Sequence, residues 1–167
     1  MSSYKSVPTV FTIDEALDKV EIEDLRDEMQ GWLDNMSGTA LENTNRYSMA
    51  EEAVSQLDDV DNIDFDELWD VIPEDGLITA DELKALSVTC YLFEPKNRKS
   101  SPSRAYRLSN AIAHITAGLE AIRDYIEDKL SGATEVPQDI QAIINTLDEI
   151  ADTVANLDGV DFPGMFG

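Results

Sequence analysis

The feature that most constrains the fold is a regular spacing of apolar residues in the second half of the chain. Large aliphatic side chains recur over residues 108–126 at alternating steps of three and four, so they lie along one side of an α-helix. This seam predicts a helix over about 104–130, and a similar pattern over 140–157 predicts a second one. Residues 104–162 are therefore predicted to form a helical hairpin.

The first half carries the same type of pattern. Apolar residues recur at three- and four-residue steps over residues 22–36 and again over 47–57. Two amphipathic helices are predicted, with a stop signal at Ser37 and Gly38 between them. Residues 21–65 therefore form the first predicted hairpin.

The two hairpins align without a gap when the chain is shifted by 97 residues. Residues 25–27 (Leu-Arg-Asp) then fall on 122–124 (Ile-Arg-Asp), and 63–65 (Ile-Asp-Phe) fall on 160–162 (Val-Asp-Phe). Coincidental helical periodicity is the alternative explanation. One hairpin cannot bury its own apolar face, and a second copy supplies the missing surface. The sequence thus predicts a mainly α protein of a single domain, 1–167, in which a duplicated helical hairpin forms a four-helix-bundle-like core.

The segments outside the hairpins receive simpler predictions. Residues 1–11 contain Ser and Pro and are interpreted as a loose leader. Residues 66–103 are predicted to be a short helical insertion that includes a basic loop. Within it, residues 88–93 are β-branched and aromatic, which fits either a helix end or a short strand. Residues 163–167 form the tail.

The charge is large and unevenly distributed. The chain has 35 acidic and 12 basic residues, a formal net charge of −23. Residues 14–82 hold 23 acidic and 3 basic residues, whereas residues 83–107 hold 6 basic residues and 1 acidic residue. An acidic excess of this size repels phosphates, and the chain lacks the basic footprint that nucleic-acid binding requires. We therefore expect no direct binding to nucleic acid and none to a membrane.

The expected compartment is the cytoplasm. The single cysteine, Cys90, cannot form an intramolecular disulfide, which suits a reducing environment. Residues 1–11 lack the charged and then apolar order of a signal peptide. The apolar run over 88–93 is far shorter than the ~18 residues that a membrane-spanning helix needs.

Groups that could carry catalysis are scarce. His114, the only histidine, lies among small residues and is interpreted as a packing residue, against a catalytic or ligand role. Cys90 has no obvious neighbouring base and is interpreted as a structural thiol. The chain contains no glycine-rich phosphate loop, nucleophile elbow or metal-spaced His/Cys cluster. We expect no enzymatic activity, no catalytic residue and no cofactor.

One segment is similar to half of a calcium-binding loop. Residues 75–83 place Asp, Gly, Ile and Glu in the order of the second half of an EF-hand. Val71 and Pro73 stand where acidic ligands belong, so the first half fails. A capping box of Thr79 and Glu82 explains the same residues. We therefore predict no metal site.

Two stretches resemble segments of small uncharacterised acidic bacteriophage proteins. They are residues 24–36 (DLRDEMQGWLDNM), followed by Tyr47 and residues 50–53 (AEEA), and residues 103–111 (SRAYRLSNA). The resemblance implies a viral origin, and hence the cytoplasm of a host cell, but it transfers no site residues. Acidic helical proteins that block host defence or DNA-handling proteins are one known type in that setting, and virion components are another. The similarity to DNA-mimic inhibitors is one of composition only.

The acidic surface is the main functional signal. Carboxylates on a helix face stand ~5–6 Å apart, a spacing comparable with that of successive phosphates along a nucleic-acid strand. The leading hypothesis is therefore an acidic protein that captures or blocks a basic, nucleic-acid-binding surface of a host or viral protein. The residues predicted to bind this partner are Glu51, Glu52, Asp58, Asp59, Asp61, Asp64, Asp66 and Glu67.

The alternative hypothesis is a phage structural or assembly protein that acts by helical self-association. In that case the basic loop contacts an acidic face on another copy, and the protein is a homo-oligomer. The residues predicted for this second contact are Lys96, Arg98, Lys99, Arg104 and Arg107.

Overall fold

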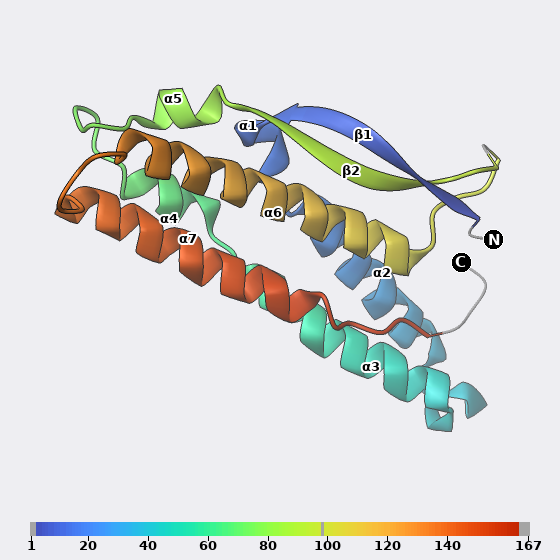
Figure 1. The fold of residues 1–167 in the computed structure, drawn as a ribbon. Coiled ribbons are helices and arrows are strands. Elements are labelled where there is room, and N and C mark those ends of the chain that lie inside the picture. Colours follow the sequence, from blue (N-terminus) through green and yellow to red (C-terminus); the bar gives the residue numbers. More distant parts are fainter. Residues whose placement is uncertain (1–2, 98, 164–167) are drawn as a thin grey trace.

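The long helix α6, Arg104–Lys129, is the element around which the others pack (Figure 1). The computed structural model describes residues 3–97 and 99–163. Ser103 begins α6 as its N-cap, because its hydroxyl accepts a hydrogen bond from the N–H of Tyr106. Helix α7, Gln138–Leu157, returns beside α6, and both helices lie where the apolar spacing predicts them. Their facing side chains are fully buried, among them Ile122, Ile126 and Ile143.

Two further helices form the first hairpin. Helix α2, Val20–Met36, and helix α3, Asn45–Leu57, are joined through the 3-10 helix η1, Ala40–Asn43. A second 3-10 helix, η2, Asp58–Asn62, continues directly from α3 and packs against α7.

Short helices complete the helical part. Helix α1, Ile13–Ala16, begins with a capping box in which Thr12 and Glu15 exchange hydrogen bonds. Helix α4, Phe65–Asp70, packs against α7, and helix α5, Ala80–Lys84, contacts α1. Helix α1 also lies against α6, where a Cβ added to Gly118 would stand 3.1 Å from the Cβ of Ala16. Close approach at this small residue lets α1 fill the space between α6 and the strands. None of the helices in the described part of the chain combines the length and apolar character needed to cross a bilayer.

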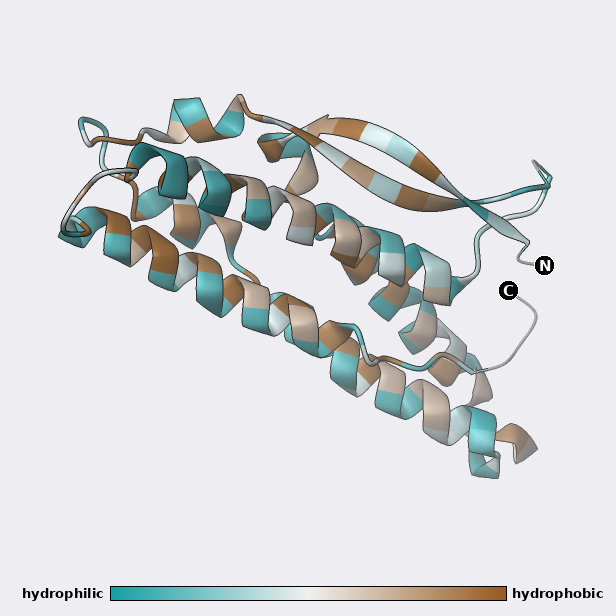
Figure 2. Ribbon diagram, in the orientation of Figure 1, coloured by the Kyte–Doolittle hydropathy of each residue, from teal (hydrophilic) through white to brown (hydrophobic). Residues whose placement is uncertain are grey.

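Two strands lie along α6 as an antiparallel ribbon. Strand β1, Tyr4–Thr12, pairs with β2, Ser87–Pro95, in a register that joins Tyr4 to Pro95 and Thr12 to Ser87. Alternate side chains point towards the helices, and Val88 and Cys90 are buried in this way. Figure 2 shows the corresponding change of hydropathy along both strands.

The prediction of a four-helix bundle is wrong. Residues 1–11, predicted to be a loose leader, supply most of β1, and residues 88–93 belong to its partner β2. The β-branched and aromatic side chains of both segments favour extended backbone, and each strand satisfies the hydrogen bonds of the other. A ribbon therefore covers a side of α6 that the bundle prediction left bare (Figure 1).

Helix α3 supplies a second reason for the correction. The main core joins α6 and α7 to the first part of α2, to the last turns of α3, to η2 and to the short helices. The far end of the first hairpin has a separate small core of Met29, Leu33 and Ala50. Figure 1 shows this end extending away from α6. Helix α3 buries only Ala50, Ala53 and Leu57, which is too little apolar surface for a fourth bundle helix. The duplication itself stays a prediction.

Candidate functional site

A shallow groove of about 330 Å³ lies between α2 and α3. Apolar side chains of Leu33 and Val54 line it together with the carboxylates of Asp34, Glu51 and Asp58. An arginine or lysine side chain packs its hydrocarbon part on apolar surface while its charged head donates hydrogen bonds to carboxylates. The groove therefore has the composition needed to receive basic side chains.

Arg26 gathers more carboxylates beside this groove. Its Nη1 lies 2.8 Å from a carboxylate oxygen of Asp61 and 3.8 Å from one of Asp58, and its Nε lies 3.7 Å from Asp27. The hydrogen bond from Arg26 lowers the pKa of Asp61, so this carboxylate stays ionised. Three carboxylates surround one guanidinium, and the cluster keeps a net negative charge.

Lys19 positions η2 by binding backbone oxygens. Its Nζ donates hydrogen bonds to the backbone oxygens of Val60, at 3.3 Å, and Ile63, at 2.7 Å. These bonds hold η2 against the start of α2, and η2 carries Asp58 and Asp61. The local backbone is thus held in place while the two carboxylates remain directed towards Arg26.

The other residues predicted for partner binding lie elsewhere. Asp64 is the N-cap of α4, and its side chain accepts hydrogen bonds from the N–H groups of Asp66 and Glu67. Asp66 and Glu67 occupy the first turn of α4, where negative charge is stabilised by the helix dipole. Glu52 is exposed on α3, and Asp59 is half-buried on η2. The structure therefore brings Glu51 and Asp58 into the groove, places Asp61 beside it, and leaves the other five outside.

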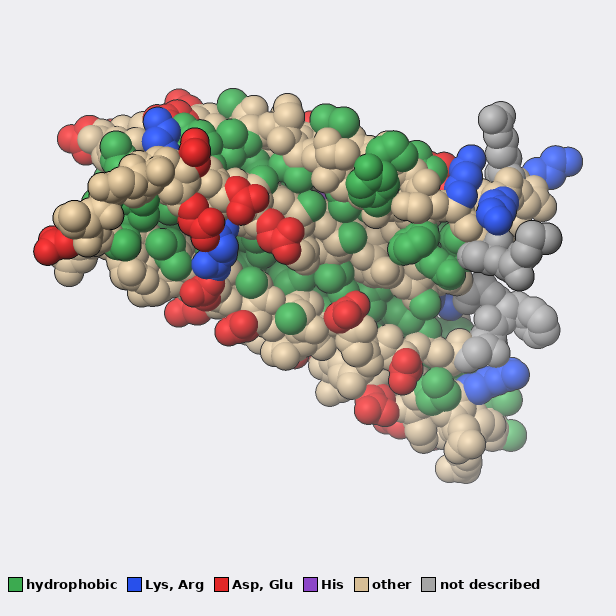
Figure 3. All heavy atoms as spheres, viewed as in Figure 1, with side chains coloured by type: hydrophobic (Ala, Val, Ile, Leu, Met, Phe, Trp, Pro, Cys, Tyr) green, Lys and Arg blue, Asp and Glu red, His purple; other side chains and the backbone are tan. Residues whose placement is uncertain are grey.

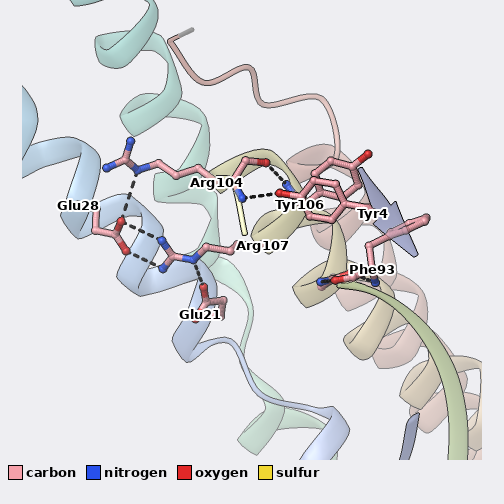
Figure 4. Close-up of polar contacts among 9 residues, drawn as sticks. Tyr4, Glu21, Glu28, Phe93, Arg104, Tyr106 and Arg107 are labelled. Atoms are coloured by element: carbon pink, nitrogen blue, oxygen red, sulfur yellow. Dashed lines mark hydrogen bonds and ion pairs between the residues drawn. The ribbon is translucent and has the colours of Figure 1, made fainter. Parts of the chain in front are cut away.

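The predicted basic loop is divided. Arg107 on α6 donates to both oxygens of Glu28 on α2, at 2.9 and 2.6 Å, and to Glu21 at 2.5 Å (Figure 4). Arg104 reaches the same Glu28 at 3.4 Å. These bonds lower the pKa of Glu28 and clamp α2 to α6. The two arginines thus bind within their own chain.

Two more members of the basic loop, Lys96 and Lys99, follow the end of β2. Lys96 and Lys99 are exposed, and Arg98 lies outside the described residues. In Figure 3, Lys and Arg side chains gather at the ribbon end of the molecule, while acidic side chains are spread over much of the face shown. Other Lys and Arg side chains on this face stand among the acidic ones.

An aromatic cluster joins the ribbon to the start of α6, and the sequence analysis did not identify it. The rings of Tyr4 and Tyr106 stack with centroids 3.5 Å apart, and Phe93 meets Tyr106 edge-on at 5.5 Å (Figure 4). The hydroxyl of Tyr4 also accepts a hydrogen bond from the N–H of Ser103 at 2.9 Å. The aromatic side chain of Tyr4, within the segment interpreted as a loose leader, was the sequence feature that could have indicated this contact.

His114 and Cys90 both lie between α6 and the ribbon. The ring of His114 packs edge-on against Phe11 with centroids 3.8 Å apart, and burial lowers its pKa. Burial also raises the pKa of the Cys90 thiol, which disfavours the reactive thiolate. Both environments support packing roles.

The loop similar to part of an EF-hand turns into α5. Thr79 is the N-cap of α5, and Glu82 is engaged by Thr79 and by the hydroxyl of Tyr125. Within the described residues, no group of three or more His, Cys, Asp or Glu side chains is arranged to hold a metal ion.

A wider hollow of about 660 Å³ lies beside this loop. Its lining includes Trp69, Asp70, Glu74 and Asp81. The Nζ of Lys84 already stands 4.9 Å from the centroid of the Trp69 ring. The chain thus places its own lysine over this aromatic ring. The groove between α2 and α3 is therefore the better candidate for binding a basic side chain of another protein.

The comparisons with known proteins add no relative. No family model, curated protein or solved structure matches this chain.

Proposed function

We propose that this is an acidic binding protein that captures or blocks a basic protein surface through the groove between α2 and α3. The observation that carries the proposal is that Asp34, Glu51 and Asp58 line one groove together with the apolar side chains of Leu33 and Val54. Asp27 and Asp61 extend the negative charge beside the groove. An average solvated helix face presents carboxylates, but it does not combine them with a hollow that accepts the stem of a long side chain.

The partner is a protein whose arginines and lysines are arranged to neutralise phosphates. Carboxylates displayed along two helices and η2 compete for such a surface, so the protein acts as a mimic of nucleic acid. The resemblance to phage proteins makes a host defence protein or a DNA-handling protein the expected target. The net charge of −23 accelerates the encounter through long-range attraction.

The test begins with affinity capture from a bacterial host and continues with the captured protein in surface plasmon resonance. The groove variant carries Asp34→Asn, Glu51→Gln and Asp58→Asn. A matched variant, Glu149→Gln, Asp152→Asn and Asp158→Asn, removes the same charge from exposed positions in and just after α7. We expect the groove variant to slow association by about tenfold and the matched variant to slow it far less.

Salt provides a second measurement on the same pair. Screening shortens the Debye length from ~10 Å at 0.1 M to ~3 Å at 1 M, so wild-type binding should weaken as salt rises. If the two variants slow association equally, the association rate depends on the total charge of the protein and not on the groove. A flat salt response together with unchanged association would show that the groove is an ordinary solvated surface.

The alternative, a phage structural or assembly protein acting by helical self-association through the basic loop, has less support. Arg104 and Arg107 form ion pairs with Glu28 and Glu21 of the same chain. Two of the five basic residues predicted to contact a second copy are therefore already used within one chain.

A further inference from the structure

The outer face of the β1–β2 ribbon carries exposed apolar side chains. Val10 is 66% exposed, Tyr91 is 65% exposed and Phe93 is 41% exposed. Pro8 stands opposite Tyr91 in the register and is also exposed. Three of these four residues are large apolar groups, which folded proteins normally cover when several lie together on one face.

The edges of the ribbon are unsuited to accepting another strand. The side-chain amide of Asn110 on α6 both donates to the oxygen of Phe93 and accepts from its N–H, each at 2.8 Å, so this part of the β2 edge is occupied. On the other edge, Pro8 of β1 has no N–H to donate. Strand addition is therefore blocked on both sides, and only the face remains for a partner.

The two ends of the ribbon carry opposite charge. Lys5, Lys96 and Lys99 lie at the end near Tyr4 and Pro95, with Glu94 as the one acidic residue of that part of β2. Asp14 and Glu15 follow β1 at the other end, where α5 adds Asp81 and Glu82 against the single basic residue Lys84. Nine-residue strands separate these ends by ~30 Å. A second ribbon lying antiparallel on the first would place each basic end over an acidic end.

We propose that the outer face of the ribbon packs against the same face of a second copy of this chain, around a two-fold axis near Pro8 and Tyr91. Such a contact buries Val10, Tyr91 and Phe93 of both copies and pairs the charged ends. The α2–α3 groove lies at the part of the molecule that extends away on the other side of α6 (Figure 1). Each dimer therefore presents two outward grooves, which raises avidity for a partner that has repeated basic sites.

The experiment is sedimentation equilibrium of the full chain from about 1 to about 100 µM at physiological salt. The wild type should pass from 18.5 kDa towards twice that mass. Tyr91→Asp should weaken dimerisation by about tenfold or more, because an exposed aromatic side chain at an interface centre dominates its energy. The matched variant Val136→Asp alters an exposed valine that is 47% accessible in the α6–α7 connection, and it should leave the dimer unchanged.

A charge reversal tests the antiparallel arrangement itself. Lys96→Glu with Lys99→Glu should weaken the dimer, and so should Asp14→Lys with Asp81→Lys. The four changes together should restore it, because each end again meets its opposite. A wild type that stays monomeric over the whole range would overturn the proposal. So would a monomer that cosediments with vesicles of phosphatidylserine and phosphatidylcholine, since the apolar face would then serve a lipid surface.

Discussion

The two helical hairpins align in sequence but contribute differently to the core of the fold. At the offset of 97 residues, Ala50 on α3 corresponds to Leu147 on α7, and Ala53 corresponds to Ile150. All four residues are buried. Leu147, Ile150 and Ala53 belong to the main core, whereas Ala50 contributes to the small core at the end of the first hairpin, and both α3 residues are much smaller than their α7 counterparts. The second hairpin thus supplies apolar volume, and the first leaves room for a groove.

Charge follows the same division. In the first hairpin, Arg26 is shared among three carboxylates of α2 and η2. The aligned residue of the second hairpin, Arg123, pairs with Asp148 on α7. The same helical spacing of apolar residues therefore builds a core where the side chains are large, and leaves a binding surface where they are small and acidic residues surround them.

The largest expected effect is on core volume. Leu147→Ala should lower the free energy of unfolding by about 2–5 kcal/mol, because it removes a buried aliphatic group from the main core and leaves a cavity. At the aligned position, Ala50→Gly should lower it by only ~1 kcal/mol, the usual cost of glycine within a helix. Urea unfolding followed by circular dichroism measures both. Similar losses for the two variants would contradict the larger contribution of position 147 to the core.

An intermediate effect is expected from the ion pairs. Arg107→Met should lower the free energy of unfolding by about 1–2 kcal/mol, because Arg107 bonds both oxygens of a half-buried Glu28 and also Glu21. Arg123→Met removes a more exposed pair and should cost about 0–1 kcal/mol. Equal losses would show that the clamp between α2 and α6 is no stronger than a surface pair.

The same clamp predicts a pH dependence. The pKa of Glu28 is lowered below 4.5 by Arg107, so its contribution to stability is present above pH 4.5 and is lost as pH falls through the lowered value. Glu28→Gln should therefore be less stable than wild type at neutral pH, and the difference should shrink in acid. Urea titrations at several pH values check this sign, and a gap that widens in acid would refute it.

The smallest effect concerns a residue that the sequence assigned to partner binding. Asp64→Ala should lower the free energy of unfolding by about 1 kcal/mol, because Asp64 caps α4. At the offset of 97, its counterpart Asp161 precedes no described helix, and Asp161→Ala should change stability by less than ~0.5 kcal/mol. Thermal unfolding of both variants measures these changes in stability. If Asp64→Ala does not change stability, Asp64 is not needed as a cap and becomes a candidate partner contact again.

Helix positions could be predicted because the apolar spacing is strong. Helix α6 ends within one residue of the predicted limit at 130, and the hydroxyl of Thr79 accepts an N-cap hydrogen bond as its spacing to Glu82 predicts. The helix arrangement could not be predicted, because spacing does not tell how much volume an apolar position provides. Alanines at positions 50 and 53 satisfy the pattern on α3 without supplying a bundle surface.

Strand β1 was not predicted, for a different reason, whereas a short strand was one of the two alternatives for residues 88–93. Val7, Thr9 and Phe11 alternate as a strand requires, but Pro8 within the run argued against it. The proline is tolerated because β1 is an edge strand of a two-stranded sheet. For the candidate site, the acidic excess identified Glu51, Asp58 and Asp61. The acidic excess could not show that Arg26, Arg104 and Arg107 form ion pairs within the chain, because their partners lie on other elements.

The pairing of β1 with β2 also sets the order of events during synthesis. Thr12 pairs with Ser87, and Tyr4 pairs with Pro95, so residues 13–86 must be synthesised before the first strand finds its partner. Closing so long a loop is slow compared with forming local helices. The β1 segment, with its exposed Val10, therefore remains unpaired in the nascent chain while α2 and α3 already have all their residues. Pairing of the ribbon is therefore later than formation of α2 and α3, and the β1 segment stays accessible to chaperones and proteases until β2 has been made.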